Sequence, residues 1–321
     1  MVRQRSVDAA MAEERPEKHT IRGLWLELLQ QIDRPDLEVP PPLYMTLSGA
    51  LGMDIELLSA RGLVKKTETG AVHPDHYHKF IAVESSPTAV LALQKKFPGL
   101  KILEVSFVNL VRSSSPTAWP TGEHKDLCRA RVINLDLNAG LVATEDQGQV
   151  VFPLLTVVRK LCQVHALPPQ LDWHLLLTID GRINWTEEVG RAVQAFLAEN
   201  FRREVEFADG SRGFLGKELY EQIDAIRVQD CGLLDSDNQQ ALLMLLVPKK
   251  IVQLVHDQGW RLVTLRNLRY GGTADRAPMV TWLLHFTWDP RATRTPDAVY
   301  RDSLKTVLNG AGRIAQDGSM T

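Results

Sequence analysis

The most informative single residue in this chain is an acid that ends an apolar run. Glu84 follows residues 80–83 (FIAV), a segment typical of a buried strand, and residues 85–87 (SSP) after it are typical of a helix start. A carboxylate can accept hydrogen bonds from two vicinal hydroxyl groups at once, and ligands of α/β sheets bind at the carboxyl ends of strands. Glu84 is therefore placed to bind a ribose; the alternative is an exposed acid that merely ends a strand.

Two glycines and two polar residues mark other places where chemistry could occur. Gly49 and Gly52 follow the short apolar run 42–47, and glycine lets the backbone approach a ligand where a Cβ would collide. Asp136 and Asn138 follow a later apolar run, and either side chain could accept a hydrogen bond from an amine and leave the nitrogen lone pair exposed. Simpler alternatives are a turn at the glycines and a capped turn after Asp136.

The segments around these residues alternate between strand and helix. The strands that the sequence predicts are 42–47, 80–83, 100–105, 131–137, 174–179, 261–269 and 279–288. The helices that it predicts are 21–32, 53–62, 87–97, 154–164, 187–201, 239–247 and 249–258. This alternation predicts an α/β protein with a doubly wound, mostly parallel seven-stranded sheet and helices on both faces. The last two strands lack a crossover helix between them and predict a C-terminal antiparallel hairpin.

Composition predicts a globular protein with one main domain. Of the 321 residues, 44% are hydrophobic and 24% charged, and the formal net charge of −2 demands no nucleic-acid partner. Residues 1–18 mix both charges with few large apolar groups and predict a disordered tail, ahead of a domain over 19–290 and a C-terminal extension over 291–321. The stretch 202–247 is predicted as an insertion that could cover the site.

Targeting and cysteine patterns predict a cytoplasmic protein with no membrane partner. No apolar run approaches the length of a bilayer span, and the N-terminal segment has no apolar core of a secretory signal. The three cysteines, Cys128, Cys162 and Cys231, are odd in number and far apart, which argues against a disulfide framework.

Several other kinds of site are weak or absent in the sequence. It has neither a Gly-x-Ser-x-Gly nucleophile motif nor a Gly-x-x-x-x-Gly-Lys-Ser/Thr phosphate loop, which disfavours hydrolases and nucleoside triphosphatases. His73, Asp75, His76 and His78 suggest a metal, but no finger-like cysteine or histidine pair accompanies them, and we predict a polar loop with no metal. Basic and aromatic residues interleave near 201–217 and 261–276, where they could track a nucleic-acid backbone or simply form solvated faces.

From about residue 20 to residue 290, the order of elements resembles class I S-adenosylmethionine-dependent methyltransferases, which have strand–helix units followed by a hairpin. The resemblance implies a Rossmann-like methyltransferase domain over 19–290 and S-adenosylmethionine as cofactor. It places Asp136 and Asn138 in the catalytic loop that faces the methyl group. The cofactor-binding positions that it implies are Thr46, Ser48, Gly49, Gly52, Glu84, Ser85, Ser106 and Phe107.

The chain departs from the family's pattern at several of these positions. Thr46 stands where an acid is usual, Ser48 replaces a glycine, and Ser106 stands where an acid commonly contacts the adenine. The expected function is methyl transfer to a nucleic-acid base or another amine. An alternative is an inactive binding or assembly module with a protein partner. A nicotinamide-dependent oxidoreductase is disfavoured, because the hairpin is antiparallel and no Gly-x-Gly-x-x-Gly occurs.

Overall fold

The computed structural model divides the chain into two compact units. The first unit comprises Met1–Leu135 and Ile314–Thr321, and the second comprises Asp136–Arg313. The residues that the structure describes are 16–32, 43–47, 49, 51–77, 79–105, 130–137, 143–144, 150–151, 153–168, 170–182, 187–225, 234–256, 258–272, 277–289, 307 and 310–321.

The first unit contains parallel strands in the order β4-β1-β2-β3. They are β1 (Tyr44–Thr46), β2 (Phe80–Glu84), β3 (Lys101–Glu104) and β4 (Val132–Asp136), whose last residue is the first of the second unit. Met45 of β1 is in register with Ile81 of β2 on one side and with Ile133 of β4 on the other. Strands β2 and β3 are therefore added on one side of β1, and β4 is added on its other side. This reversal of strand order is the point at which ligands bind in open α/β sheets.

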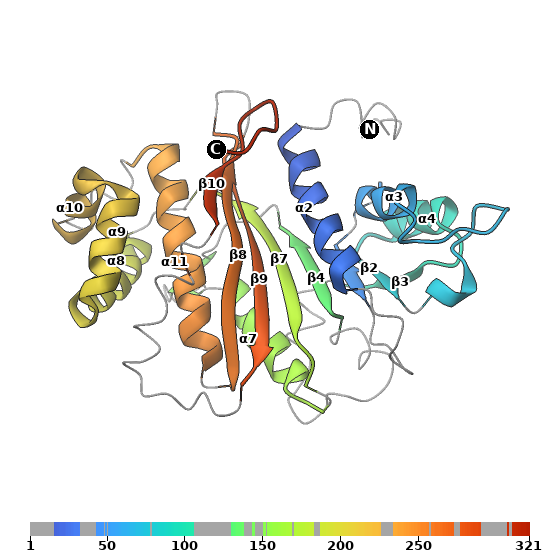
Figure 1. The fold of residues 1–321 in the computed structure, drawn as a ribbon, viewed down its shortest axis with the longest axis horizontal. Helices are drawn as coiled ribbons and strands as arrows, with labels where there is room; N and C mark the ends of the chain where they lie inside the picture. Colours follow the sequence, from blue (N-terminus) through green and yellow to red (C-terminus); the bar gives the residue numbers. More distant parts are fainter. Residues whose placement is uncertain are drawn as a thin grey trace. The chain divides into compact units, whose positions relative to one another are not determined.

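The helices of the first unit lie where the apolar spacing of the sequence predicts them, and Figure 1 labels them. They are α2 (Pro16–Ile32), α3 (Met53–Ala60) and α4 (Pro87–Lys96), with a short 3-10 turn at Pro74–His76. Ser86 begins α4 as predicted, because its hydroxyl accepts a hydrogen bond from the backbone N–H of Ala89 and Pro87 occupies the first turn. Helix α2 begins at Pro16, so residues 16–18 belong to a helix and not to the predicted tail.

The C-terminal residues of the first unit pack against α2. The Thr20 hydroxyl donates a hydrogen bond of 2.6 Å to the backbone oxygen of Gly318. Ile314 and Met320 form an antiparallel bridge around a turn, and Ile314 is buried. The first unit is thus built from two stretches of chain that are remote in sequence.

The second unit contains strands in the order β10-β8-β9-β7. They are β7 (Trp173–Asp180), β8 (Trp260–Tyr270), β9 (Met279–Trp288) and β10 (Ala311–Arg313), and a separate two-stranded sheet pairs β5 (Ala143–Thr144) with β6 (Val150–Val151). Strand β9 is antiparallel to both β7 and β8, whereas β10 is parallel to β8. The predicted C-terminal antiparallel hairpin is confirmed.

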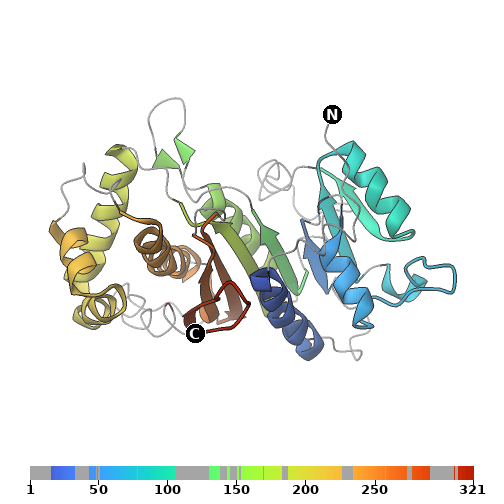
Figure 2. The same ribbon diagram turned by 90° about the horizontal axis from the view of Figure 1, so that it is seen from above.

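One long helix separates the strands of the second unit from a group of shorter helices. The helices are α7 (Pro153–His165), α8 (Glu187–Arg203), α9 (Val205–Leu215), α10 (Lys217–Ala225) and α11 (Ser236–His256). Helix α11 lies along β8, with α8, α9 and α10 on its other side (Figures 1 and 2). Part of the predicted insertion 202–247 is therefore the helices α9 and α10.

The prediction of a mixed α/β fold with antiparallel C-terminal strands is confirmed, with two differences. Eight main strands are described, four in each unit, because β10 adds a strand to the predicted seven. Helix α11 runs without interruption through Pro248, where two helices were expected. A proline inside a helix costs about 3 kcal/mol, but residues on both sides of it, such as Leu246 and Ile251, are fully buried, and this packing outweighs the cost. Among the described residues, no helix combines the length and apolar character needed to cross a membrane.

Candidate functional site

Glu84 lies at the carboxyl end of β2, beside the point where the strand order reverses. Its carboxylate is partly exposed, and Oε1 accepts a hydrogen bond of 2.8 Å from the backbone N–H of Ser86. The bond orients the carboxylate at the start of α4. No other described residue hydrogen-bonds to this side chain, so its second oxygen remains able to accept from a ligand hydroxyl.

The two glycines that follow β1 have different surroundings. Both have left-handed backbone conformations, with φ of +56° at Gly49 and +54° at Gly52. Among the described residues, a Cβ at Gly49 would meet no atom within 4 Å, whereas a Cβ at Gly52 would lie 2.6 Å from Cε2 of Phe97 and 2.8 Å from Cδ2 of Leu93. Gly49 therefore leaves open space, and Gly52 allows α3 to begin against α4.

Thr46, the last residue of β1, is turned into the protein. Its side chain is fully buried, and its hydroxyl donates a hydrogen bond of 2.8 Å to Oδ2 of Asp54, in the first turn of α3. The last side chain of β1 is thus a hydroxyl that is bonded to an acid of the following helix.

Asp54 is the centre of a polar cluster, which we call the Asp54 cluster. Oδ2 also accepts hydrogen bonds from the hydroxyl of Tyr44 at 3.0 Å and from Nδ2 of Asn134 at 2.7 Å. Oδ1 accepts from Nε of Arg22 at 3.1 Å, an ion pair whose side chains are only 10% and 12% exposed. The members of the cluster are Arg22 of α2, Tyr44 and Thr46 of β1, Asp54 of α3 and Asn134 of β4.

The electrostatics of this cluster keep Tyr44 protonated. Burial raises the pKa of Tyr44 well above its ordinary value, and the negative charge of Asp54 raises it further, which outweighs the opposing hydrogen bonds from Thr46 and Asn134. The phenol therefore serves as a hydrogen-bond donor to the carboxylate. A small pocket beside Tyr44 and Asp54, walled by apolar residues of α2 and α3, has room for about one water molecule.

Sequence patterns identified only one member of the Asp54 cluster as a site residue. Thr46 was predicted from the resemblance, whereas Arg22, Tyr44, Asp54 and Asn134 were missed. A usable signal was present, because Tyr44, Thr46 and Asn134 are polar residues within apolar strands, and Tyr44 and Thr46 are two apart and share one face of β1.

Asp136 is partly exposed at the end of β4. The next residue, Leu137, donates its backbone N–H to the carbonyl of Thr178 in β7 at 2.9 Å. Ser85 is exposed, directly after Glu84. The other predicted site residues, Ser48, Ser106, Phe107 and Asn138, lie outside the described residues.

The described part of the histidine-rich loop is held by local contacts. Nδ1 of His73 lies 3.4 Å from the carboxylate of Asp75, and the buried His76 stacks on Phe80 and accepts a hydrogen bond from the backbone of Lys65. His78 lies outside the described residues, which contain no group of three side chains arranged to hold a metal ion.

In the predicted basic and aromatic stretch near 201–217, several cations have local partners. Arg203 and Lys217 each pair with a glutamate one helical turn away, and the guanidinium of Arg212 lies over the ring of Tyr220. These three cations therefore have partners within the protein, and binding of a nucleic acid to this stretch stays a prediction.

Comparison with known proteins gives no family model and no curated protein that matches the chain. Several solved structures are similar to it, among them two methyltransferases. A SAM-dependent methyltransferase from Agrobacterium tumefaciens is 12% identical, with a TM-score of 0.32 over 86% of this chain and 62% of that one. The plantazolicin methyltransferase BamL, solved with a triazolic desmethylPZN analogue and SAH, is also 12% identical, with a TM-score of 0.35 over 84% and 86% of the two chains. This chain thus spans less than two thirds of the first neighbour's length.

Proposed function

We propose that the first unit binds S-adenosylmethionine at the carboxyl ends of β1 and β2 and that the protein is a methyltransferase. The observation that carries the proposal is the placement of Gly49 and Glu84. Gly49 follows β1 with no described atom within 4 Å of its Cβ position, and Glu84 ends the neighbouring strand with an oxygen able to accept a hydrogen bond. Strand order reverses at β1, so both residues lie where a nucleoside is expected.

Each residue has a distinct part in the proposed reaction. Glu84 accepts hydrogen bonds from the ribose hydroxyls, and the backbone at Gly49 approaches the methionine moiety. When bound, S-adenosylmethionine supplies a methyl group activated by its sulfonium. Asp136 accepts a hydrogen bond from the attacking amine and holds the nitrogen lone pair toward that methyl group, so that alignment supplies most of the catalysis. The proposed acceptor is a nucleic-acid base or another amine.

A thermal shift experiment tests the binding site. S-adenosylhomocysteine at 100 times its dissociation constant should add about 2.7 kcal/mol to the free energy of unfolding, which raises the melting temperature by several degrees. Glu84→Ala should remove most of this shift, whereas Glu68→Ala, a change at an exposed acid of the same unit, should retain it. The proposal is wrong if the wild-type protein shows no shift, and a shift with reduced nicotinamide dinucleotide instead would favour the oxidoreductase.

A second candidate is a binding or assembly module that holds the cofactor without catalysis. Thr46 favours it, because this buried residue ends β1 with a hydroxyl bonded to Asp54, and β1 therefore contributes no acid to the site. Methyl transfer from labelled cofactor to nucleic acids, peptides and small amines separates the two. We also propose a cytoplasmic location, because free thiols such as that of the buried Cys162 are typical of reducing compartments.

A further inference from the structure

The Asp54 cluster lies at both ends of the segment that joins β1 to α3, and this segment contains Gly49. We infer that Asp54 is a positioning residue of the candidate site: its carboxylate fixes this segment so that the backbone at Gly49 faces the cofactor. The inference rests on the proposed function for its ligand, but its structural part concerns this segment alone.

One carboxylate ties together the two ends of the segment. Thr46 is the last residue of β1 and Asp54 is in the first turn of α3, so the 2.8 Å hydrogen bond between them closes the connection. Within it, the backbone N–H of Gly52 donates to the carbonyl of Gly49 at 3.3 Å. Both glycines hold left-handed conformations, which are easily lost without such support because glycine has many accessible conformations.

The same carboxylate also binds the strand on the other side of β1. Asn134 is in register with Thr46 and donates to Oδ2 of Asp54 at 2.7 Å, while Tyr44 donates to that oxygen from β1. The start of α3 is therefore bonded to both strands between which the order reverses. Displacement of α3 along with the segment would break these hydrogen bonds together.

The charge of Asp54 is needed as well as its shape. Oδ2 faces three donors and Oδ1 faces the guanidinium of Arg22, so both oxygens act as acceptors. An amide in place of the carboxylate has the same size but only one acceptor oxygen. In Asp54→Asn the amide NH₂ would point either at Arg22 or at the three donors, and either orientation opposes donor to donor. The variant thus weakens the hydrogen bonds of the Asp54 cluster while preserving the volume of the side chain.

The control is an ion pair on the same helix outside the cluster. Glu56 pairs with Lys96 at 2.9 Å, is more exposed than Asp54 and has no hydrogen bond to a member of the cluster. Lys96 also donates to the carbonyl of Leu51 at 2.9 Å, and the amide oxygen of a glutamine at position 56 can still accept from Lys96. Glu56→Gln therefore removes a carboxylate from α3 and leaves the Asp54 cluster intact.

The experiment combines hydrogen exchange of the ligand-free full-length chain with calorimetric binding of S-adenosylhomocysteine. Asp54→Asn should raise the exchange rates of the amides of Leu47, Gly49, Leu51 and Gly52 by tenfold or more and weaken binding by a similar factor. Amides in the strands of the second unit should keep their rates, which a general loss of stability would not allow. Glu56→Gln should leave both measurements within twofold of wild type.

The outcomes separate this inference from the proposed function. Exchange and affinity of Asp54→Asn within twofold of wild type would overturn the inference. If wild-type protein fails to bind the ligand, the proposed function fails, and the exchange rates still decide whether Asp54 fixes the segment. If Asp54→Asn does not fold, Thr46→Val removes one donor with little change of shape and should raise the same exchange rates by a smaller factor; unchanged rates there would also overturn it.

Discussion

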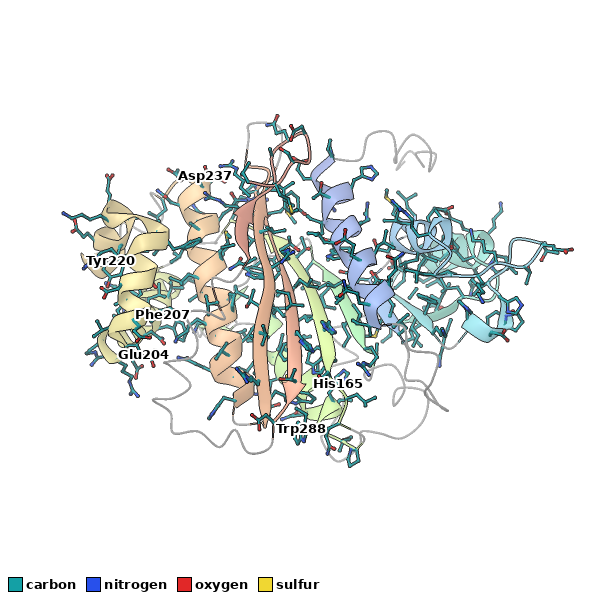
Figure 3. The ribbon with its side chains drawn as sticks, in the orientation of Figure 1. His165, Glu204, Phe207, Tyr220, Asp237 and Trp288 are labelled. Atoms are coloured by element: carbon teal, nitrogen blue, oxygen red, sulfur yellow. The ribbon has the colours of Figure 1, made fainter. Side chains whose placement is uncertain are left out.

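A buried lysine in the second unit makes the stability of the protein depend on pH in a way that can be calculated. Lys249 of α11 is fully buried, and its ammonium lies 4.2 Å from the centre of the Phe207 ring. Glu204 and Phe207, both labelled in Figure 3, come from the group of helices packed on α11. Burial lowers the pKa of Lys249 from 10.5 to about 8, although the charge of Glu204 acts in the opposite direction.

The lowered pKa determines both the sign and the size of the effect. Between pH 8 and 10.5 the unfolded chain binds more protons at this lysine than the folded protein does, so folding becomes more favourable as the pH rises. At neutral pH the buried ammonium reduces the free energy of unfolding by about 3 kcal/mol. About 2 kcal/mol of this is regained between pH 8 and pH 10.

Lys249→Met isolates this contribution because Lys250, whose pKa burial also lowers to about 8, is present in both proteins. Urea denaturation followed by circular dichroism at pH 8, 9 and 10 measures the free energy of unfolding of both proteins. Between pH 8 and pH 10 this free energy should rise by about 2 kcal/mol more for the wild type than for the variant. Lys217→Met, at a lysine that is 79% exposed, should track the wild type. Parallel pH profiles for wild type and Lys249→Met would refute the reasoning.

Four further changes test the packing described above by denaturation or exchange. Gly52→Ala should lower the free energy of unfolding by about 3 kcal/mol or more, because its Cβ would meet Phe97 and the backbone is left-handed. Gly49→Ala, whose Cβ would meet no described atom, should lower it by only about 1 kcal/mol, and equal losses would contradict this difference in packing. Asn267→Ala should cost about 2–4 kcal/mol, because Nδ2 donates to two buried backbone carbonyls, and a neutral result would be inconsistent with those bonds. Deletion of Ile314–Thr321 should raise amide exchange in the first two turns of α2, and unchanged protection there would count against the packing on α2.

The sequence was sufficient for features that depend on local pattern. The strand that Glu84 ends, the cap of α4 at Ser86 and the antiparallel hairpin all follow from residues close together in the chain. Apolar alternation and capping act over a few residues, so a single sequence carries them.

Features that depend on contacts remote in sequence were missed. Pro248 predicted a break, but burial of residues on both sides keeps α11 continuous. Asp54 looks like an ordinary acid in the first turn of a helix, and only the pairing of β1 with β4 brings Asn134 to it across 80 positions. A Cβ at Gly52 would meet Phe97, a contact that only the packing of α4 reveals, while cofactor binding at Gly52 stays a prediction.

The bridge between Thr20 and Gly318 has a consequence for biosynthesis. A ribosome adds about 5–20 residues per second, so the roughly 180 residues of the second unit separate the two stretches of the first unit by about 10–35 s. During that interval the nascent α2 lacks its contact with Gly318, and Ile314, which is buried in the folded protein, has not yet been made. Chaperones that bind exposed apolar segments would meet the amino-terminal portion in this incomplete state, and a chain that ends at residue 313 would remain in it.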